Sequence, residues 1–186
     1  MRCCLLQLGI GPAGYTCAVP VPSFLSKLRE QIGHAPVLLP GVAAVVRNDA
    51  GHLLCLLRSD THEWSLPSGI CEPGEDPART IARELYEEAG IVVRPERILA
   101  VQGGVHVEYP NGDVADYVSI MFECRWLTGT PEPRDGEALE LRFVPPDALP
   151  PIRLLDRIAL DLGDLGGSEA LFAWDDSWLP RDPPSE

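Results

Sequence analysis

Residues 69–91 read GICEPGEDPARTIARELYEEAGI, and this stretch predicts one helix that carries most of its charged side chains. Asp76 can cap the start of the helix, and Pro77 suits the first helical position because that N–H group has no intrahelical partner. Gly90 can take the positive φ that a residue just past a helix end adopts. The helix is therefore expected over residues 77–89.

Acidic and apolar side chains fall on two neighbouring stripes of this helix. Glu84, Glu87 and Glu88 recur at three- and four-residue steps, so their carboxylates share one face. Like charges at this spacing destabilise a helix by about 0.2–0.5 kcal/mol per pair, and a cation would offset the repulsion. Arg83 is one such cation, and a bound Mg²⁺ or Mn²⁺ ion is a stronger one because hard divalent cations favour carboxylate oxygens. The apolar stripe consists of Ala78, Ile81, Ala82, Leu85 and Ala89.

The spacing of the whole segment distinguishes a metal site from a solvated acidic helix face. The pattern G-x(5)-E-x(7)-R-E-U-x-E-E-x-G-U, with U an apolar residue, is met at every position from Gly69 to Ile91. At average residue frequencies, such a match arises by chance about once in 10⁹ start positions. The segment resembles the Nudix box and does not depart from it across its 23 residues. The preceding flank, 64–69, is also similar to this family, except that Ser68 stands where glycine is common.

The resemblance implies both a fold and an activity. The Nudix fold is an α+β fold, an α/β/α sandwich in which a mixed β-sheet lies between helices. The family hydrolyses a diphosphate bond in a nucleoside diphosphate linked to a further group, X, with Mg²⁺ or Mn²⁺ as cofactor. Water attacks phosphorus, and the products are a nucleoside monophosphate and the phosphorylated remainder. The expected partner is a small nucleotide or nucleotide derivative.

The resemblance also assigns roles to residues of the box. Arg83 is expected to orient Glu84, and Glu75 is expected to pair with Arg83. The divalent cation is expected to bind the carboxylates of Glu84 and Glu88 and the backbone carbonyl of Gly69. Glu87 is expected to join these ligands or to orient a bound water.

The general base is not fixed across the family. Some members use a glutamate of the box, and others use a glutamate from a loop before a late strand. Glu137 is the candidate for such a loop residue here, and Glu140 is the second choice. The alternative is that both are solvated acids of a loop and a strand face.

Three residues outside the box are candidates for substrate contact. Tyr109 lies 18 residues past Ile91, where an aromatic residue resembles the dinucleoside polyphosphate hydrolases of the family. Trp64 can stack on a base, although a tryptophan in the core or at its rim explains it equally simply. Arg58 follows an apolar run and can face a phosphate, with a surface arginine as the alternative.

Composition and charge narrow the class of protein. The chain has 186 residues, of which 45% are hydrophobic, and this suits one globular domain. Its formal net charge of −13 argues against binding of long nucleic acid, which requires a basic surface. No apolar run reaches the roughly 18 residues of a membrane span. The six cysteines form no CxxC pair, so a reducing cytoplasm is the simplest setting. The resemblance also allows a homodimer, although no residue pattern marks an interface.

The chain divides into a central domain and two less regular ends. Residues 1–21 are expected to form a disordered extension, 22–165 the Nudix domain, and 166–186 a loosely ordered tail. Amphipathic helices are predicted over 22–34, within the domain, and over 151–162.

Strands are predicted on both sides of the box. The second is expected to return beside the first as a hairpin, and the third is expected to break at Gly103 and Gly104. Residues 128–137 are expected to form a loop. The predicted strands are 37–47, 52–58, 96–107, 115–126 and 139–144.

Two other functions on the same scaffold stay open. A nucleotide-sensing or regulatory module without catalysis would keep the fold, but such modules usually lose a glutamate of the box, and none is lost here. A related chemistry, such as isopentenyl isomerisation or mRNA decapping, is the third hypothesis. Isomerisation would require Cys55 or Cys124 to reach the site, and decapping would favour a basic path for RNA.

Overall fold

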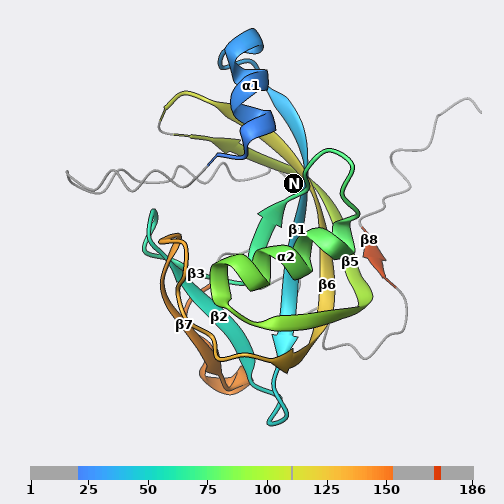
Figure 1. Ribbon diagram of the computed structural model, residues 1–186, viewed down its shortest axis with the longest axis vertical. Helices are drawn as coiled ribbons and strands as arrows, with labels where there is room; N and C mark the ends of the chain where they lie inside the picture. The colour runs from blue at the N-terminus through green and yellow to red at the C-terminus, as the bar shows by residue number, and fades with distance from the viewer. Residues whose placement is uncertain (1–20, 110, 153–169, 173–186) are drawn as a thin grey trace, which may run out of the picture.

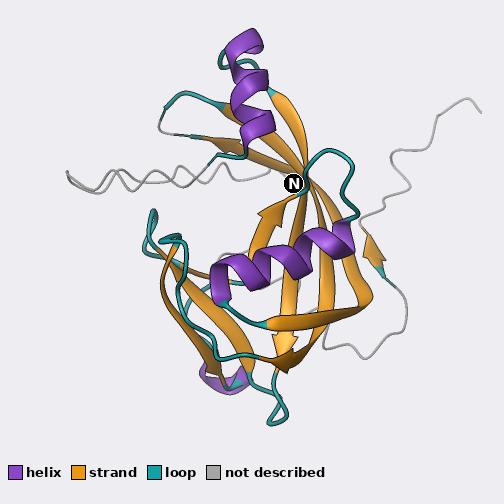
Figure 2. Ribbon diagram, viewed as in Figure 1, coloured by secondary structure: helices purple, strands orange, loops and turns teal. Residues whose placement is uncertain are grey.

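The computed structural model describes residues 21–109, 111–152 and 170–172. No helix in these ranges has the length and apolar character needed to cross a membrane. A short 3₁₀ helix spans Pro146–Ala148. The other elements, drawn in Figures 1 and 2, are α1 (Ser23–Ile32), β1 (Val37–Arg47), β2 (Leu53–Arg58), β3 (Trp64–Ser65), β4 (Ser68–Ile70), α2 (Pro77–Ala89), β5 (Val92–Glu108), β6 (Val114–Thr128), β7 (Ala138–Val144) and β8 (Leu171–Phe172).

The strands form one mixed sheet in the order β3-β2-β1-β6-β5-β8, with β4 added to β1 and β7 added to β2. β1 is buried on both faces from Gly41 to Val46, as its apolar sequence predicts, whereas Leu38 near its start is exposed. Its side chains alternate: Val42 and Ala44 join the cluster beneath α2, whereas Ala43 and Val45 join a second cluster on the opposite face. The predicted α+β fold with a mixed sheet is confirmed.

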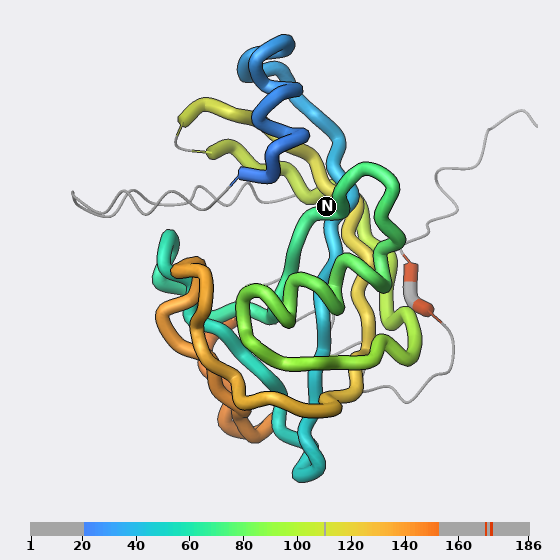
Figure 3. The backbone as a smooth tube through the Cα atoms, viewed as in Figure 1, coloured from blue at the N-terminus to red at the C-terminus, as the bar shows by residue number. Residues whose placement is uncertain are grey.

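The predicted antiparallel hairpin of the first two strands is confirmed, but only next to its turn. β1 and β2 share only the register pair Arg47 and Leu53 before they diverge. β1 instead pairs in parallel with β6 along its whole length, and β2 pairs with β7. The prediction rested on the short turn at 48–52. β1 and β2 form longer pairings with β6 and β7, and Figure 3 shows β1 and β2 separating beyond the turn. The candidate site lies beside the end of β2.

The predicted helix over 77–89 is confirmed as α2. Its apolar stripe includes Ile81 and Leu85, which are fully buried against β1 and β6. Gly90 takes a φ of 68° and ends the helix, as expected. The expected side-chain cap is wrong: Asp76 makes no capping hydrogen bond through its side chain. Its backbone carbonyl accepts the N–H group of Thr80 at 2.9 Å, and Pro77 leaves one N–H group fewer to satisfy.

The remaining predicted elements differ mainly at their ends. α1 confirms the N-terminal amphipathic helix and packs Leu25 against β1 and β6. β5 begins at Val92 and does not break at its two glycines; its register shifts there instead, between Gln102 and Val105. Gly104 has a φ of 73°, so the glycine pair accommodates a bulge within a continuous strand.

Some predictions fall outside the described residues. The extension at 1–20 does so, as does most of the predicted helix at 151–162 and most of the tail from 166. The domain limits of 22–165 therefore stay a prediction.

Candidate functional site

Glu84 lies directly against the backbone of β4. A Cβ atom added to Gly69 would overlap the side chain of Glu84, so only glycine leaves space for this carboxylate at that position. Gly69 pairs with Val42 of β1, which anchors its backbone in the sheet. The helix face and β4 thus bring the Glu84 carboxylate next to the predicted carbonyl ligand.

Arg83 joins three acidic side chains around one guanidinium. Its Nε and Nη2 donate to the two carboxylate oxygens of Glu75, each at 3.0 Å. Nη2 also lies 3.1 Å from Glu84 Oε1, and Nη1 donates to Glu87 Oε2 at 2.9 Å. The hydrogen bonds from Arg83 lower the pKa of Glu75 to about 2, and the hydroxyl of Thr80 donates to the same carboxylate at 2.9 Å. Arg83 therefore offsets part of the negative charge of these three carboxylates, although burial still raises the pKa of Glu84.

Glu88 has no such compensation. Its side chain belongs to a residue that is only 8% exposed, and it has no hydrogen-bond donor or salt-bridge partner among the residues that the structure describes. Burial, followed by the charges of Glu84, Glu137 and Asp135, raises the pKa of Glu88 to about 9. A buried carboxylate in this state stays protonated at neutral pH unless a cation joins it.

A loop between β6 and β7 brings two further acids to Glu88. The loop docks on the end of α2, where Glu132 N–H donates to the Ala89 carbonyl and Arg134 N–H donates to the Glu88 carbonyl, both at 3.1 Å. It then turns so that the N–H group of Glu137 donates to Asp135 Oδ1 at 2.9 Å. Carboxylate oxygens of Glu88, Asp135 and Glu137 consequently lie within 4.8 Å of one another.

Glu137 is half-buried in this acid cluster of Glu88, Asp135 and Glu137. Burial and the charge of Asp135 raise its pKa to about 7. Its carbonyl accepts the N–H group of Ser59 at 2.8 Å, which fixes the loop to the end of β2. Glu137 is thus held beside Glu88 with a pKa near neutrality, where a carboxylate can accept a proton from water.

The donor set fits a hard divalent cation. Carboxylate oxygens of three residues converge, and Glu88 among them is buried without a hydrogen-bond donor or ion-pair partner in the described part of the chain. Mg²⁺ and Mn²⁺ favour oxygen ligands of this kind, and they would offset the mutual repulsion of the acids. Arg83 already pairs with Glu84 and Glu87, so the demand for a cation is greatest at Glu88, which has no ion-pair partner among the described residues.

A small pocket opens beside the acid cluster, and its lining residues are Leu56, Arg58, Ser68, Glu88, Glu137 and Ala138. Arg58, at the end of β2, brings positive charge to this pocket. Its Nε donates to Asp60 Oδ1 at 2.8 Å and its Nη2 donates to Asp60 Oδ2 at 2.6 Å. One cation and two acids, Glu88 and Glu137, therefore line the same small space.

A family model for the NUDIX domain matches residues 37–162 of this chain. The chain belongs to the Nudix family. The match spans the whole described sheet up to the end of β7, including the box, α2 and the loop that carries Glu137. By family, the chain is a Nudix hydrolase.

Curated relatives share the Nudix region to different extents. A MutT-like protein of Streptomyces ambofaciens is 32% identical over 130 residues, which cover 66% of this chain and 79% of the relative. A putative ADP-ribose pyrophosphatase, YjhB, of Bacillus subtilis is 35% identical over 99 residues, which cover 52% of this chain and 47% of that protein. An RNA pyrophosphohydrolase of Photorhabdus laumondii is 43% identical over 61 residues, or 35% of its own length. The match thus spans less than half of the latter two relatives.

Solved structures show the same fold. A MutT protein from Methanosarcina mazei superposes with a TM-score of 0.60 at 23% identity, over 73% of this chain and 99% of that chain. A MutT Nudix hydrolase from Burkholderia pseudomallei gives a TM-score of 0.55 at 26% identity, over 68% of this chain and 98% of that one.

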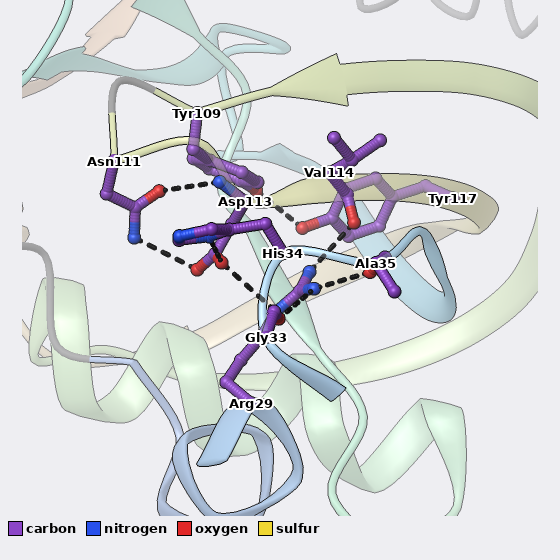
Figure 4. A network of polar contacts seen from close by, with 9 residues as sticks. All are labelled: Arg29, Gly33, His34, Ala35, Tyr109, Asn111, Asp113, Val114 and Tyr117. Atoms are coloured by element: carbon purple, nitrogen blue, oxygen red, sulfur yellow. Dashed lines mark hydrogen bonds and ion pairs between the residues drawn. The ribbon is translucent and has the colours of Figure 1, made fainter. Parts of the chain in front are cut away.

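The other predicted contacts of this Nudix chain lie outside the acid cluster. Tyr109, at the end of β5, pairs its hydroxyl with that of Tyr117 at 2.6 Å, beside the network that ties α1 to Asp113 (Figure 4). Trp64 is half-buried and its ring lies 4.4 Å from the guanidinium of Arg142. Glu140 points to Arg142 as well, at 3.5 Å. These placements leave Tyr109 and Trp64 as untested substrate contacts and favour Glu137 over Glu140 as the base.

Three residues of the site were missed by the sequence analysis. Asp135 precedes a glycine two positions before Glu137, which signals a turn but not a meeting with α2. Thr80 has no distinguishing feature in the sequence, and only the structure shows that its hydroxyl donates a hydrogen bond to Glu75. Asp60 stands two residues after Arg58, and nothing in that spacing predicts their paired hydrogen bonds.

Proposed function

We propose that this chain hydrolyses a diphosphate bond in a nucleoside diphosphate linked to a further group X, by attack of water at phosphorus. The observation that carries the proposal is the convergence of Glu88, Asp135 and Glu137 within 4.8 Å at the C-terminal part of the box helix. The intact box supports catalysis over a silent regulatory module, because every glutamate of the pattern is present.

The proposed cation is Mg²⁺ or Mn²⁺. When bound, it neutralises charge on the diphosphate and lowers the pKa of a coordinated water. The carbonyl of Gly69 and the carboxylates of Glu84, Glu87 and Glu88 are the proposed ligands. Arg83 supports them by holding Glu84 and Glu87 at 3.1 and 2.9 Å, with Glu75 fixing Arg83 in turn.

Glu137 is the proposed general base. Its raised pKa of about 7 lets it take a proton near neutral pH. Its backbone N–H and carbonyl groups are both held by hydrogen bonds, to Asp135 and Ser59. Asp135 strengthens this role because its charge contributes to the raised pKa. The proton removed from water would reside on Glu137 Oε until product release.

Arg58 is proposed to contact phosphate, and Tyr109 and Trp64 to contact the remainder of a small nucleotide substrate. The net charge of −13 supports a small substrate over long nucleic acid. A cytoplasmic location and a homodimer complete the proposal. The identity of X has to come from experiment, since the relatives' names cover both ADP-ribose and RNA.

Isomerisation is disfavoured by the placement of the cysteines. Cys55 and Cys124 are both buried in the core clusters on either side of the sheet. Burial raises the pKa of Cys124 to about 12, so its thiol is a poor source of thiolate.

A substrate panel tests the proposal. Nucleoside triphosphates, ADP-ribose, nucleotide sugars and dinucleoside polyphosphates would be incubated with Mg²⁺ or Mn²⁺, and monophosphate products would be followed by chromatography. Hydrolysis of one class, lost on adding a chelator and in Glu88→Gln, is the expected result. Metal binding without hydrolysis of any of these compounds would contradict the proposal and favour the regulatory module.

A further inference from the structure

Asp60 forms a two-point contact with Arg58, which lines the pocket. The two distances of 2.8 and 2.6 Å pair both oxygens of Asp60 with Nε and Nη2 of Arg58. Asp60 is itself fixed, because its Oδ1 also accepts the N–H group of Thr61 at 2.7 Å. This planar, two-point geometry sets the orientation of a guanidinium and not merely its position.

The turn that carries Asp60 is held in an unusual conformation. His62 has a φ of 57°, and among the described residues it is the one non-glycine residue with positive φ. Its N–H group donates to the Arg58 carbonyl at 3.2 Å, while Arg58 N–H donates to the Glu63 carbonyl at 3.0 Å. Such strain persists when surrounding contacts hold it, and it is concentrated at functional sites. The turn therefore folds Asp60 back onto Arg58.

The pair is poorly suited to a purely stabilising role. The side chains of Arg58 and Asp60 are 25% and 32% exposed, and ion pairs near the surface contribute little net stability. Arg58 is, however, the one cation among the residues that line the pocket, alongside Glu88 and Glu137. With Nε and Nη2 used by Asp60, Nη1 is left for a ligand, since no partner for it is found in the described part of the chain.

We propose that Asp60 is a positioning residue that aims the free edge of Arg58 at a phosphate group of the substrate. This inference rests on the proposed function and names a specific contact within it. The diphosphate would sit between Arg58 and the acid cluster, so a misaligned guanidinium would leave negative charge on the phosphate unmatched. Asp60 acts through Arg58 and need not touch the substrate.

Charge alone predicts the opposite effect of removing Asp60. An acidic residue near a phosphate repels it, so a neutral side chain at this position would strengthen anion binding if Asp60 had no positioning role. A loss of affinity on neutralisation would therefore identify positioning. The sign of the effect, and not its size alone, separates the two explanations.

The experiment measures binding of α,β-methylene ADP, a diphosphate that resists hydrolysis, by calorimetry in Mg²⁺. The variants are Asp60→Asn, Arg58→Ala and the two combined. Asp49→Asn is the matched control, because Asp49 is exposed in the turn after β1 and its neutralisation changes the net charge equally. Circular dichroism and thermal melting of each variant check the fold.

We expect Asp60→Asn to weaken binding about tenfold, as loss of a charge-assisted contact would. The double variant should bind no more weakly than Arg58→Ala, because Asp60 acts only through Arg58. Asp49→Asn should stay within about twofold of the parent. On the best substrate of the panel, Asp60→Asn should raise KM more than it lowers kcat, and Asp60→Glu should recover part of the loss.

Unchanged or tighter binding by Asp60→Asn, in a folded variant of an active parent, would overturn the inference and leave the proposed hydrolysis standing. Additive losses in the double variant would also overturn it, by showing that Asp60 acts independently. A parent chain that neither binds the analogue nor hydrolyses any panel compound would overturn both proposals.

Discussion

The two ends of the acidic helix face are built from the same residue type but have opposite electrostatics. Around Arg83, the carboxylates of Glu75, Glu84 and Glu87 lie within hydrogen-bonding or ion-pair distance of one guanidinium. The pKa of Glu75 falls to about 2 there. One turn further on, Glu88 is buried beside further acids, and its pKa rises to about 9 even though the charge of Arg58 lowers it in part.

This difference assigns separate tasks to the two halves. The Arg83 end is held together by ion pairs, so it can keep its geometry without any ligand. The Glu88 end is incomplete within the described residues and becomes satisfied only when a cation joins it. A helix with all its acids neutralised by arginine would be rigid but unable to bind metal.

The largest expected effect comes from replacing Glu88 by glutamine, with the same replacement of its neighbour Glu87 for comparison. Glu88→Gln should lower kcat/KM at least about 100-fold, because it removes a buried ligand from the unsatisfied end. Glu87→Gln should cost less than about tenfold, because Glu87 is 54% exposed and already paired with Arg83. Steady-state kinetics on the best panel substrate would measure both. Equal losses of kcat/KM in the two variants would show that the Arg83 end and the Glu88 end do not differ in their role.

Removing Arg83 should convert the satisfied end into an unsatisfied one. Arg83→Ala leaves Glu75 largely buried without its main partner, and we expect a loss of about 2–3 kcal/mol in the free energy of unfolding. Urea denaturation would measure it, with Arg79→Ala as control, since Arg79 is exposed one turn earlier on the same helix. A loss no larger than that of the control would show that Arg83 does not stabilise this end.

The two ends should also give opposite dependences of stability on pH in metal-free protein. Between the ordinary value of 4.5 and about 9, native Glu88 retains a proton that the unfolded chain has lost, so stability falls as pH rises. Glu75, with its pKa lowered to about 2, contributes stability above pH 4.5 that is lost as pH falls toward 2. Melting temperatures in EDTA from pH 3 to 9 would show both the fall in stability at high pH and the fall at low pH.

Two changes sharpen the pH experiment. Glu88→Gln should flatten the decline above pH 5, because the amide does not titrate. Mg²⁺ should raise the melting temperature more at pH 8.5 than at pH 6, since metal binding must displace the proton on Glu88. A decline of the same slope in Glu88→Gln would mean that other groups cause it.

The smallest expected effect concerns the hydroxyl on Glu75. Thr80→Val keeps the buried shape but removes the 2.9 Å hydrogen bond, and we expect a loss of about 1 kcal/mol in stability. Activity should change less than about threefold, because Arg83 still holds Glu75. Denaturation of Thr80→Val and of the exposed control Thr128→Val would test this. A larger activity loss than that of Glu87→Gln would show that Thr80 shapes the metal end too.

Local periodicity explains why the helix was predictable. The residues of α2 that pack on the sheet and those that face the site recur at three- and four-residue steps, which sequence displays directly. The same helical geometry places Glu84, Glu87 and Glu88 on one common face. Their role as metal ligands stays a prediction, supported by the family resemblance and by the buried Glu88.

Strand partners were less predictable than strands. β1 and β2 were found, but the short turn between them suggested a hairpin that the structure limits to one register pair. β1 pairs with β6, whose partner residues lie 78 positions later (115 − 37), and this places β1 inside the sheet with a core cluster on each face. A turn is signalled by a few neighbouring residues, whereas the choice of a strand partner depends on strands that lie far apart in the sequence.

The sequence by itself determined the family, the box helix and the acids on its face, since these depend on spacing within one turn of helix. Only the tertiary structure decided that Asp135 and Glu137 meet Glu88, and that Asp60 turns back onto Arg58. Those contacts require a loop to dock on the end of α2 and a strained turn to close. Both depend on backbone hydrogen bonds between segments far apart in the chain or in an unusual conformation, which residue spacing does not encode.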